Sequence, residues 1–389
     1  MQVTGCRVPR LGVVTGYGLT TIARLVALVV TAAVLMVVMG GAAAADDWRQ
    51  AIGSRQWSFP RDHGNHPEYR TEWWYVTGNL RDAAGKRYGY QLTFFRQGIR
   101  LSVGEGGNAW SIRDVYLAHF AISDVAGSRF FHSERASRRG PELAGAREGT
   151  MDVWLLNWSM RQEGEAVNLY ARDGEKELKL RLLSRKPMVF HGKNGLSQKG
   201  PAPGQASYYY SYTNMETSGT ITVPGGAPVV VTGSSWFDHE FGSNQLTADQ
   251  VGWDWFALRL SDGREVMLYV LRRKDGSVEP ASSGTVVEKD GRSRHLPLSD
   301  VSIEVLERWK SPKSGGTYPG KWRINVKTGD LDITVTPLFA NQELITGRST
   351  GITYWEGAVG ARGKSGGRDV TGEGYVELTG YAGSLGGVF

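Results

Sequence analysis

Two stretches of this sequence, 180 residues apart, repeat one pattern of a strand, a tight turn and a second strand. Residues 72–87 read EWWYVTGNLRDAAGKR, and residues 252–265 read GWDWFALRLSDGRE. Each stretch contains an Asp/Gly turn that leads into another hydrophobic segment, YGYQLTFFR in the first and VMLYVLRR in the second. Self-similarity at a fixed interval is typical of duplicated structural units. The sequence therefore predicts two copies of one β-domain, over residues 48–235 and 245–389.

Short segments that alternate polar and apolar residues recur along the rest of the chain. Examples are LKLRLLSR (178–185), SGTITVPG (218–225) and DLDITVTPL (330–338), and glycine-rich turns separate them. Helical periodicity is almost absent after residue 45. This pattern predicts an all-β fold of antiparallel sheets, as sandwiches or barrels. One irregular stretch, 191–207, is long enough to form a lid or a rim loop.

The first 45 residues form a separate segment. Arg7, Arg10 and Arg24 precede or begin the apolar run LVALVVTAAVLMVVM, and small residues ending at Ala45 follow it. This is the pattern of a cleaved signal peptide, so we expect an exported protein, periplasmic or secreted. The run and its Gly/Ala tail also approach the roughly 20 residues that span a bilayer, so an uncleaved anchor in the inner membrane stays open as the alternative.

The cysteine count and the charge exclude several classes of function. The single cysteine, Cys6, precedes the apolar run, so a processed chain has no disulfide, thiolate metal site or cysteine nucleophile. Without the three arginines of the leader, 42 basic residues face 39 acidic ones, a net charge of +3. The basic residues are scattered among acidic ones, which is typical of a solvated surface. We therefore expect no nucleic-acid partner.

The stretch SSWFDHEFG, residues 234–242, places three titratable residues among aromatic ones at the predicted junction of the two copies. Because side chains alternate along a strand, Asp238 and Glu240 share one side with Trp236, and His239 lies on the other side. Ligand sites form preferentially at domain junctions. This stretch is therefore the leading candidate for a functional site.

The neighbours of His239 predict that its ring is at least partly desolvated. Phe237 and Phe241 flank it on the same side of the strand. Burial disfavours the imidazolium cation unless a carboxylate compensates for it. A structural histidine bonded to a backbone carbonyl and a functional histidine both remain open.

The repeated strand has two faces that differ in how well they are retained between the copies. Trp73 and Tyr75 share one face in the first copy, and Trp253 and Trp255 occupy the same positions in the second. Recurrence of large aromatic residues predicts that this face is the structural core of both halves.

The opposite face of the repeated strand has diverged. It carries Glu72 and Trp74 in the first copy and Asp254 and Phe256 in the second. Divergence of this kind marks candidate ligand-binding residues, and drift of an exposed surface explains it equally well.

A second titratable cluster lies in the stretch RDHGNHPEYRTEWWY. His63 and His66 have H-x-x-H spacing, with Glu72 nearby. Spacing within a loop fixes no ligand geometry, and no third ligand is evident. A turn-forming role is favoured over a metal site, so we expect no metal.

Four segments of the chain together resemble the bacterial carotenoid 1,2-hydratases and the AttH-like secreted proteins grouped with them. These segments are HPEYRTEWWYVTGNL, SYYYSYTNMETSGTITV, SSWFDHEFGSNQL and GWDWFALRLSDG. The resemblance covers most of the chain beyond the leader. It implies two tandem lipocalin-like β-barrel domains and, in the catalytic branch, hydration of an isolated alkene without a cofactor.

The match to the catalytic residues of the hydratases is incomplete. The resemblance implicates a histidine in an Asp-His-x-Trp block and a Tyr-x-Asp pair on a following strand. His239 matches, but Phe241 replaces the tryptophan. Tyr269 is the candidate tyrosine, but Leu271 replaces the acid, which places the chain nearer the AttH-like branch. The residues that would substitute as proton donor are Asp238, Glu240, Asp254 and Glu72.

Two functions follow from these observations. The first is binding of an apolar isoprenoid- or lipid-like molecule near the domain junction, with transfer to a membrane transporter as partner. The alternative is a cofactor-free hydratase of a terpenoid- or carotenoid-like alkene, in which a carboxyl protonates the alkene and His239 is the base. The predicted catalytic residues are His239, Asp238, Glu240 and Tyr269. The predicted ligand-binding residues are Glu72, Trp74, Trp236, Phe237, Phe241, Asp254 and Phe256.

Overall fold

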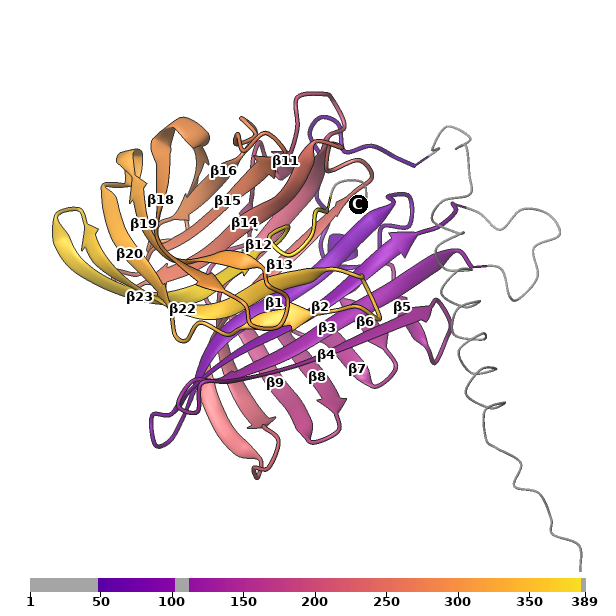
Figure 1. The fold of residues 1–389 in the computed structure, drawn as a ribbon. Helices are drawn as coiled ribbons and strands as arrows, with labels where there is room; N and C mark the ends of the chain where they lie inside the picture. The colour runs from indigo at the N-terminus through magenta and orange to yellow at the C-terminus, as the bar shows by residue number, and fades with distance from the viewer. Residues whose placement is uncertain (1–47, 102–111, 386–389) are drawn as a thin grey trace, which may run out of the picture. The chain divides into compact units, whose positions relative to one another are not determined.

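The strands of the protein form two large, curled antiparallel sheets (Figure 1). A computed structural model describes residues 48–101 and 112–385. The first sheet contains strands β1–β13 and the second contains β14–β23, which confirms the predicted all-β class of tandem lipocalin-like barrels. The predicted signal peptide lies outside the described residues. Within the described residues, no helix has the length and apolar character to span a bilayer.

The bounds of the elements follow in spatial order. The first sheet consists of β4 (Arg129–Arg138), β3 (Asp114–Asp124), β2 (Arg87–Gly98), β1 (Thr71–Asp82), β13 (Val229–Gly242), β12 (Ala206–Thr222), β9 (Lys176–Ser184), β8 (Ala166–Asp173), β7 (Trp158–Glu163), β6 (Asp152–Leu155) and β5 (Ala144–Ala146), with β10 (Val189–Phe190) and β11 (Leu196–Gln198) paired to β12. The second sheet consists of β17 (Ser293–Pro297), β16 (Ser283–Val287), β15 (Glu265–Arg273), β14 (Gln250–Leu260), β23 (Arg368–Leu378), β22 (Thr353–Ser365), β20 (Leu331–Pro337), β19 (Thr317–Val326) and β18 (Val301–Lys310), with β21 (Glu343–Ile345) paired to β22. Three 3₁₀ turns are η1 (Arg61–His63), η2 (Leu298–Asp300) and η3 (Lys327–Gly329).

The two sheets repeat the same strand order, as the sequence repeat predicts. Strand β1 lies between β2, its hairpin partner, and β13, and strand β14 lies in the same way between β15 and β23. In the first sheet Tyr75 pairs with Asp238, and in the second Trp255 pairs with Glu377. Tyr75 and Trp255 are equivalent residues of the repeat, so Asp238 and Glu377 also occupy equivalent positions. The chain from Trp48 onward forms one compact unit, and the boundaries between two domains stay a prediction.

Three apolar clusters show what covers each face of β1 and of β14. Trp74 lies in the cluster inside the first sheet, and Phe256 lies in the cluster inside the second. The third cluster lies between the two sheets and contains Tyr75 and Trp255, with Trp73 and Trp253 packed against it. The prediction that these four recurring aromatic residues form the core of each half is therefore wrong. They recur because both copies bury this face against the other copy.

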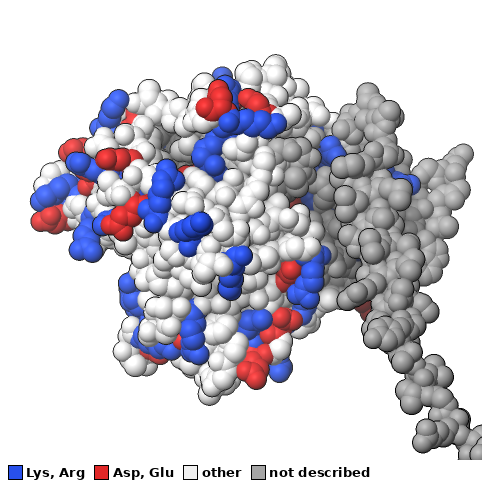
Figure 2. Space-filling model, viewed as in Figure 1, with Lys and Arg blue, Asp and Glu red and all other residues white. Residues whose placement is uncertain are grey.

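Polar contacts also join the two sheets. The hydroxyl of Tyr75 donates to a carboxylate oxygen of Glu356 on β22. The ammonium of Lys186 contacts the carboxylate of Glu265 on β15 at 2.6 Å, and both side chains are buried or nearly so. In contrast, acidic and basic side chains are interspersed over the outer face visible in Figure 2. The seam between the sheets is thus an interior region of the protein, with side chains from both copies.

Candidate functional site

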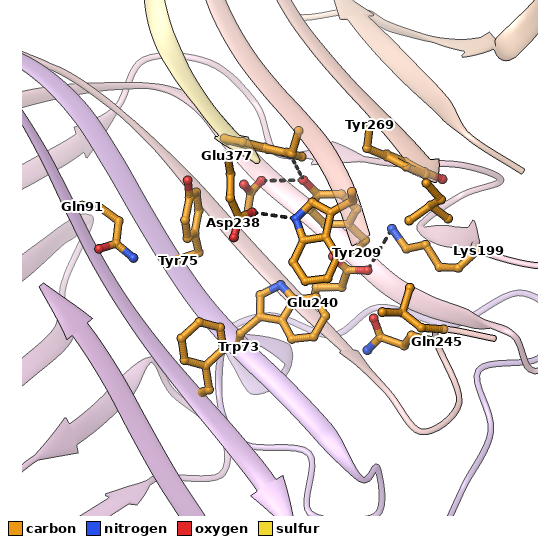
Figure 3. A pocket seen from close by; sticks show the side chains of 15 residues that line it. Trp73, Tyr75, Gln91, Lys199, Tyr209, Asp238, Glu240, Gln245, Tyr269 and Glu377 are labelled. Carbon is orange, nitrogen blue, oxygen red and sulfur yellow. Dashed lines mark hydrogen bonds and ion pairs between the residues drawn. The ribbon is translucent and has the colours of Figure 1, made fainter. Parts of the chain in front are cut away.

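A pocket lies in the seam between the two sheets, and Figure 3 shows its lining. Measured as the room for the centre of a water-sized sphere, its volume is about 100 Å³. One water needs about 10–15 Å³ by this measure, so the pocket holds several waters or part of a small ligand. The lining residues are Trp73, Tyr75, Gln91, Phe95, Lys199, Tyr209, Asp238, Glu240, Gln245, Leu246, Trp253, Trp255, Tyr269, Leu271 and Glu377.

The alternation of side chains along each strand explains why both copies contribute aromatic residues. On β1, Trp73 and Tyr75 point into the pocket, and on β14, Trp253 and Trp255 do so from the opposite sheet. The intervening residue of β1, Trp74, points into the first sheet instead. The duplicated strands therefore supply a pocket wall that is almost entirely aromatic.

Asp238 projects from β13 into this aromatic wall. Its Oδ1 atom accepts hydrogen bonds from the Tyr209 hydroxyl at 3.0 Å, from the Trp236 indole at 2.8 Å and from the Ser211 hydroxyl. All three donors reach the same oxygen, so a proton on the carboxyl belongs on Oδ2. Burial raises the pKa of Asp238 to about 7, although these hydrogen bonds oppose the shift. Asp238 is therefore partly protonated near neutral pH.

Glu377 provides a second carboxyl at the equivalent position of β23. The indole of Trp253 donates to its Oε2 atom at 2.8 Å. Burial raises the pKa of Glu377 to about 7, and the negative charges of Asp238 and Glu240 add to the effect. Near neutral pH each of these two carboxyls is therefore present in both its acid and its base form.

The third carboxyl of the pocket is paired with a cation. Glu240 accepts from the ammonium of Lys199 at 3.0 Å, and this pair is drawn in Figure 3. Burial disfavours the charge of Lys199, but Glu240 outweighs it and raises the pKa of the lysine. The ammonium also lies 4.1 Å from the ring centroid of Tyr269 and 5.2 Å from that of Tyr209. This ion pair gives the apolar pocket one fixed polar end.

Tyr269 lines the pocket with its ring, whereas its hydroxyl is held by polar groups around it. The hydroxyl donates to the carbonyl of Gln198 at 3.0 Å and accepts from the Ser283 hydroxyl at 2.9 Å. The sequence predictions for Asp238, Glu240 and Tyr269 thus converge on one cavity.

His239 lies on the other side of β13, as the alternation predicts, and it does not line the pocket. Its Nε2 atom is 2.9 Å from Oε1 of Glu72, and the Tyr210 hydroxyl is 3.0 Å from Nδ1. Its ring stacks on Trp74 with centroids 4.9 Å apart. Burial lowers the pKa of His239, although Glu72 opposes the shift, so the ring is neutral. Among the described residues, none that its ring contacts lines the pocket.

A buried ionic network surrounds His239 inside the first sheet. His66 contacts Glu72 at 2.7 Å and Asp62 at 3.2 Å, and Arg96 contacts Glu72 at 3.2 Å. Burial opposes the cation of His66, but the two carboxylates outweigh it and raise the pKa. Buried charges are retained when each has a partner of opposite sign. This network explains Asp62 and His66 of the RDHGNHP stretch as structural groups.

The same network contains a set of atoms with the spacing of metal ligands. One nitrogen of His66, one of His239 and a carboxylate oxygen of Glu72 all lie within 4.8 Å of one another. The two contacts to Glu72 have hydrogen-bond lengths of 2.7 and 2.9 Å. Tetrahedral zinc at about 2.0–2.1 Å from each ligand would hold these atoms farther apart. The hydrogen bonds therefore account for the arrangement without an ion.

The other predicted ligand-binding residues lie at four separate places. Phe237 is in the core of the first sheet with Trp74, and Phe241 stacks on His66 at 3.7 Å between centroids. Phe256 packs in the core of the second sheet. Trp236 is adjacent to the pocket through its hydrogen bond to Asp238.

Asp254 lies inside the second sheet, away from the pocket lining. Its carboxylate contacts Arg272 and the Tyr381 hydroxyl, each at 3.0 Å. Burial raises its pKa, and Arg272 opposes the shift. Asp254 is thus a buried structural acid, at the position of its copy that Trp74 occupies in the first.

Sequence reasoning missed two charged residues of the pocket. Lys199 lies in the irregular stretch 191–207, which was predicted as a lid or rim loop. That prediction could have identified Lys199 as a candidate residue of the pocket. Glu377 lies in the strand GEGYVELTGY, and the register that makes it equivalent to Asp238 is visible only in the paired strands.

Comparisons with known proteins support a single relationship over nearly the whole described chain. A family model described as AttH-like matches residues 50–381. The crystal structure of an AttH protein from Nitrosomonas europaea is 33% identical, covers 86% of this chain and 99% of its own, and superposes with a TM-score of 0.77. Kievitone hydratase from Nectria haematococca is 14% identical over 87% of this chain and 97% of its own, with a TM-score of 0.66, and shares the fold. A search of curated proteins found no match.

Proposed function

The chain belongs to the AttH-like family, and from this premise we propose that it binds an apolar, unsaturated small molecule between its two sheets and adds water to a double bond of that molecule. One observation carries the proposal: the carboxyl of Asp238 is buried among aromatic rings, and its pKa is raised to about 7. An acid of this kind keeps its proton near neutral pH and can give it to a carbon atom.

In the proposed reaction, Asp238 and Glu377 have complementary roles. The π electron pair of the alkene takes the proton of Asp238, which forms a C–H bond and leaves a tertiary carbocation. A lone pair of a water oxygen then forms the C–O bond, and the proton released from this water passes to the Glu377 carboxylate. Return of that proton to Asp238 restores the starting state, and the net change is addition of one water.

The aromatic wall has a role in this reaction as well. Trp73, Trp253 and Trp255 line the same pocket as the two carboxyls. The faces of indole rings attract cations, by about 2 kcal/mol or more when water is excluded. Such rings stabilise the developing carbocation more than the neutral alkene, and differential stabilisation of this kind accelerates a reaction.

The size and lining of the pocket point to an isoprenoid or lipid-like substrate. Its volume of about 100 Å³ accommodates the end of a chain or a compact molecule. Kievitone hydratase, named for a hydration reaction, shares the fold at 14% identity. We include export in the proposal on the strength of the leader sequence, with transfer of the ligand to a membrane transporter as a further part of it.

The test uses geraniol and farnesol as probes, in water labelled with ¹⁸O. Mass spectrometry measures addition of one labelled water, and quenching of tryptophan fluorescence measures binding. For Asp238→Asn we expect turnover to fall by at least about 100-fold, since general acids contribute roughly 10²–10⁴, with the Kd changed by less than about threefold. For the wild type we expect turnover to decline as the pH rises through about 7, because the Asp238 carboxyl loses the proton that it must donate.

Glu343→Gln is the matched control for this experiment. The Glu343 carboxylate is also buried and accepts hydrogen bonds from the hydroxyls of Ser311, Ser314 and Tyr318, the last at 2.8 Å, but it does not line the pocket. Its turnover should equal that of the wild type. Wild-type protein that binds both probes but hydrates neither would overturn the enzymatic part of the proposal and leave a binding protein. Equal turnover by Asp238→Asn would refute the role of this acid.

A further inference from the structure

A second, larger cavity opens at the other end of the seam between the sheets. Measured as before, its volume is about 720 Å³. It is lined by residues of β1, β2, β14, β20, β22 and β23 and by the residues that follow β14 and β20. Four guanidinium groups line it, from Arg81, Arg87, Arg259 and Arg362. The function proposed above makes no use of this cavity.

One carboxylate has to balance these four cations. Among the lining residues the single acid is Glu373 on β23. It contacts Arg259 at 2.7 Å and Arg81 at 3.1 Å, which are close ion pairs. The lining as a whole therefore has an excess of three positive charges.

The excess is concentrated on two arginines. Arg87 approaches Glu373 only to 3.9 Å, and its side chain is 32% exposed. No ion pair to a described residue is found for Arg362 on β22. Burial, followed by the charge of Arg81, lowers the pKa of Arg87, as expected where cations outnumber anions.

Two other exposed arginines of the same sheets have a close carboxylate partner. Arg161 contacts Asp152 at 2.9 Å, and Arg323 contacts Asp332 at 2.7 Å. Asp152 is shared with Arg147, which contacts it at 3.0 Å, and neither Arg161 nor Arg323 lines the cavity. Arg87 and Arg362, in contrast, line a cavity that could admit an anion.

Part of the cavity wall is apolar. Leu260 and Ala361 are buried beneath it, and Leu338 lines it from the end of β20. Guanidinium groups bind phosphate through paired hydrogen bonds, and a phosphate monoester presents more acceptor oxygens than a carboxylate does. A wall with both features suits a phosphate group that is attached to an apolar molecule.

We propose that this cavity is a binding site for a phosphate group, either on a free phosphorylated amphiphile or on a lipid headgroup. Arg87 and Arg362 bind the phosphate oxygens, and Glu373 holds Arg81 and Arg259 as the wall of the site. The site is separate from the aromatic pocket. Arg81 and Trp73 are eight residues apart on β1, which corresponds to about 26 Å along a strand.

The test is a binding measurement on the whole protein at low salt. Isothermal titration calorimetry with inorganic pyrophosphate measures binding of a free phosphate compound. Co-sedimentation with phosphatidic-acid vesicles, compared with phosphatidylcholine vesicles, measures binding of a phosphate headgroup. We expect the Arg87→Gln, Arg362→Gln double variant to lose at least tenfold in affinity for whichever probe the wild type binds. Removal of the internal counter-ion by Glu373→Gln should tighten binding several-fold.

The matched control is the Arg161→Gln, Arg323→Gln double variant, which removes the same number of charges from the outer surface. Its affinity should stay within twofold of the wild type. Binding of pyrophosphate would assign the site to free phosphates, and binding of the acidic vesicles alone would assign it to headgroups. No binding of any probe by the wild type, or an equal loss in both double variants, would overturn the proposal.

Discussion

Replacing the buried acid of the aromatic pocket should make the protein more stable at alkaline pH. Asp238 has an ordinary pKa of 3.8, which it regains on unfolding, and a pKa of about 7 in the folded protein. Between these values the folded state holds more protons than the unfolded state, so the free energy of unfolding falls as the pH rises. Above about pH 7 the deficit is constant, and below about pH 4 it is absent.

The size of this effect follows from the gap between the two pKa values. Each tenfold change in proton affinity corresponds to about 1.4 kcal/mol, so the gap costs the ionised protein about 4 kcal/mol. Asparagine is neutral at every pH, and its amide oxygen can still accept from Tyr209 and Trp236. Asp238→Asn should therefore raise the free energy of unfolding at pH 8 by about 4 kcal/mol, or the Tm by about 6 °C in a unit of this length.

Urea denaturation of the wild type and of Asp238→Asn, at several pH values from 4 to 8, measures this difference. The two proteins should be about equally stable at pH 4 and should diverge as the pH rises. A difference between Asp238→Asn and the wild type that does not change with pH would refute the reasoning that burial holds this carboxyl in its protonated form.

Two further predictions concern the first sheet and the seam. Arg96→Met removes a fully buried guanidinium that contacts Glu72 at 3.2 Å and Asp114 at 2.9 Å. We expect a loss of about 3–5 kcal/mol in urea denaturation because two buried carboxylates each lose a cationic partner; a loss below about 1 kcal/mol would contradict this. Gly89→Leu adds a side chain whose Cβ would lie 2.8 Å from the Cβ of Ala358 in the other sheet. It should lower stability by about 1–3 kcal/mol and weaken binding of farnesol, whereas Gly347→Leu, where a Cβ meets nothing within 4 Å, should do neither.

The separation of Asp238 from His239 illustrates what could be read from the strand itself. Alternation predicted that Asp238 and Glu240 share one side and that His239 lies on the other, and the structure agrees. The same reasoning could not tell which side faces a cavity. Both sides of β13 are buried, one within its own sheet and one against the other copy, so apolar neighbours on either side look alike in the sequence.

The resemblance to the hydratases directed attention to His239 as a base and left the proton donor unassigned. The structure brings Asp238 and Glu377 into one pocket, although they lie on strands that are far apart in the chain. Lys199 reaches the same pocket from a loop, and its ion pair with Glu240 has no counterpart in local sequence. Such long-range contacts depend on how the two sheets pack, and residue spacing along a strand does not encode that packing.

The sequence by itself determined the all-β class, the duplication and the side of each strand on which a given residue lies, because these depend on backbone geometry and on local alternation. The tertiary structure alone decided that the recurring aromatic face lies between the copies and that equivalent carboxyls from both copies share one pocket. The physical reason is that alternation fixes relative orientation within a strand, whereas burial of a face depends on which other surface covers it.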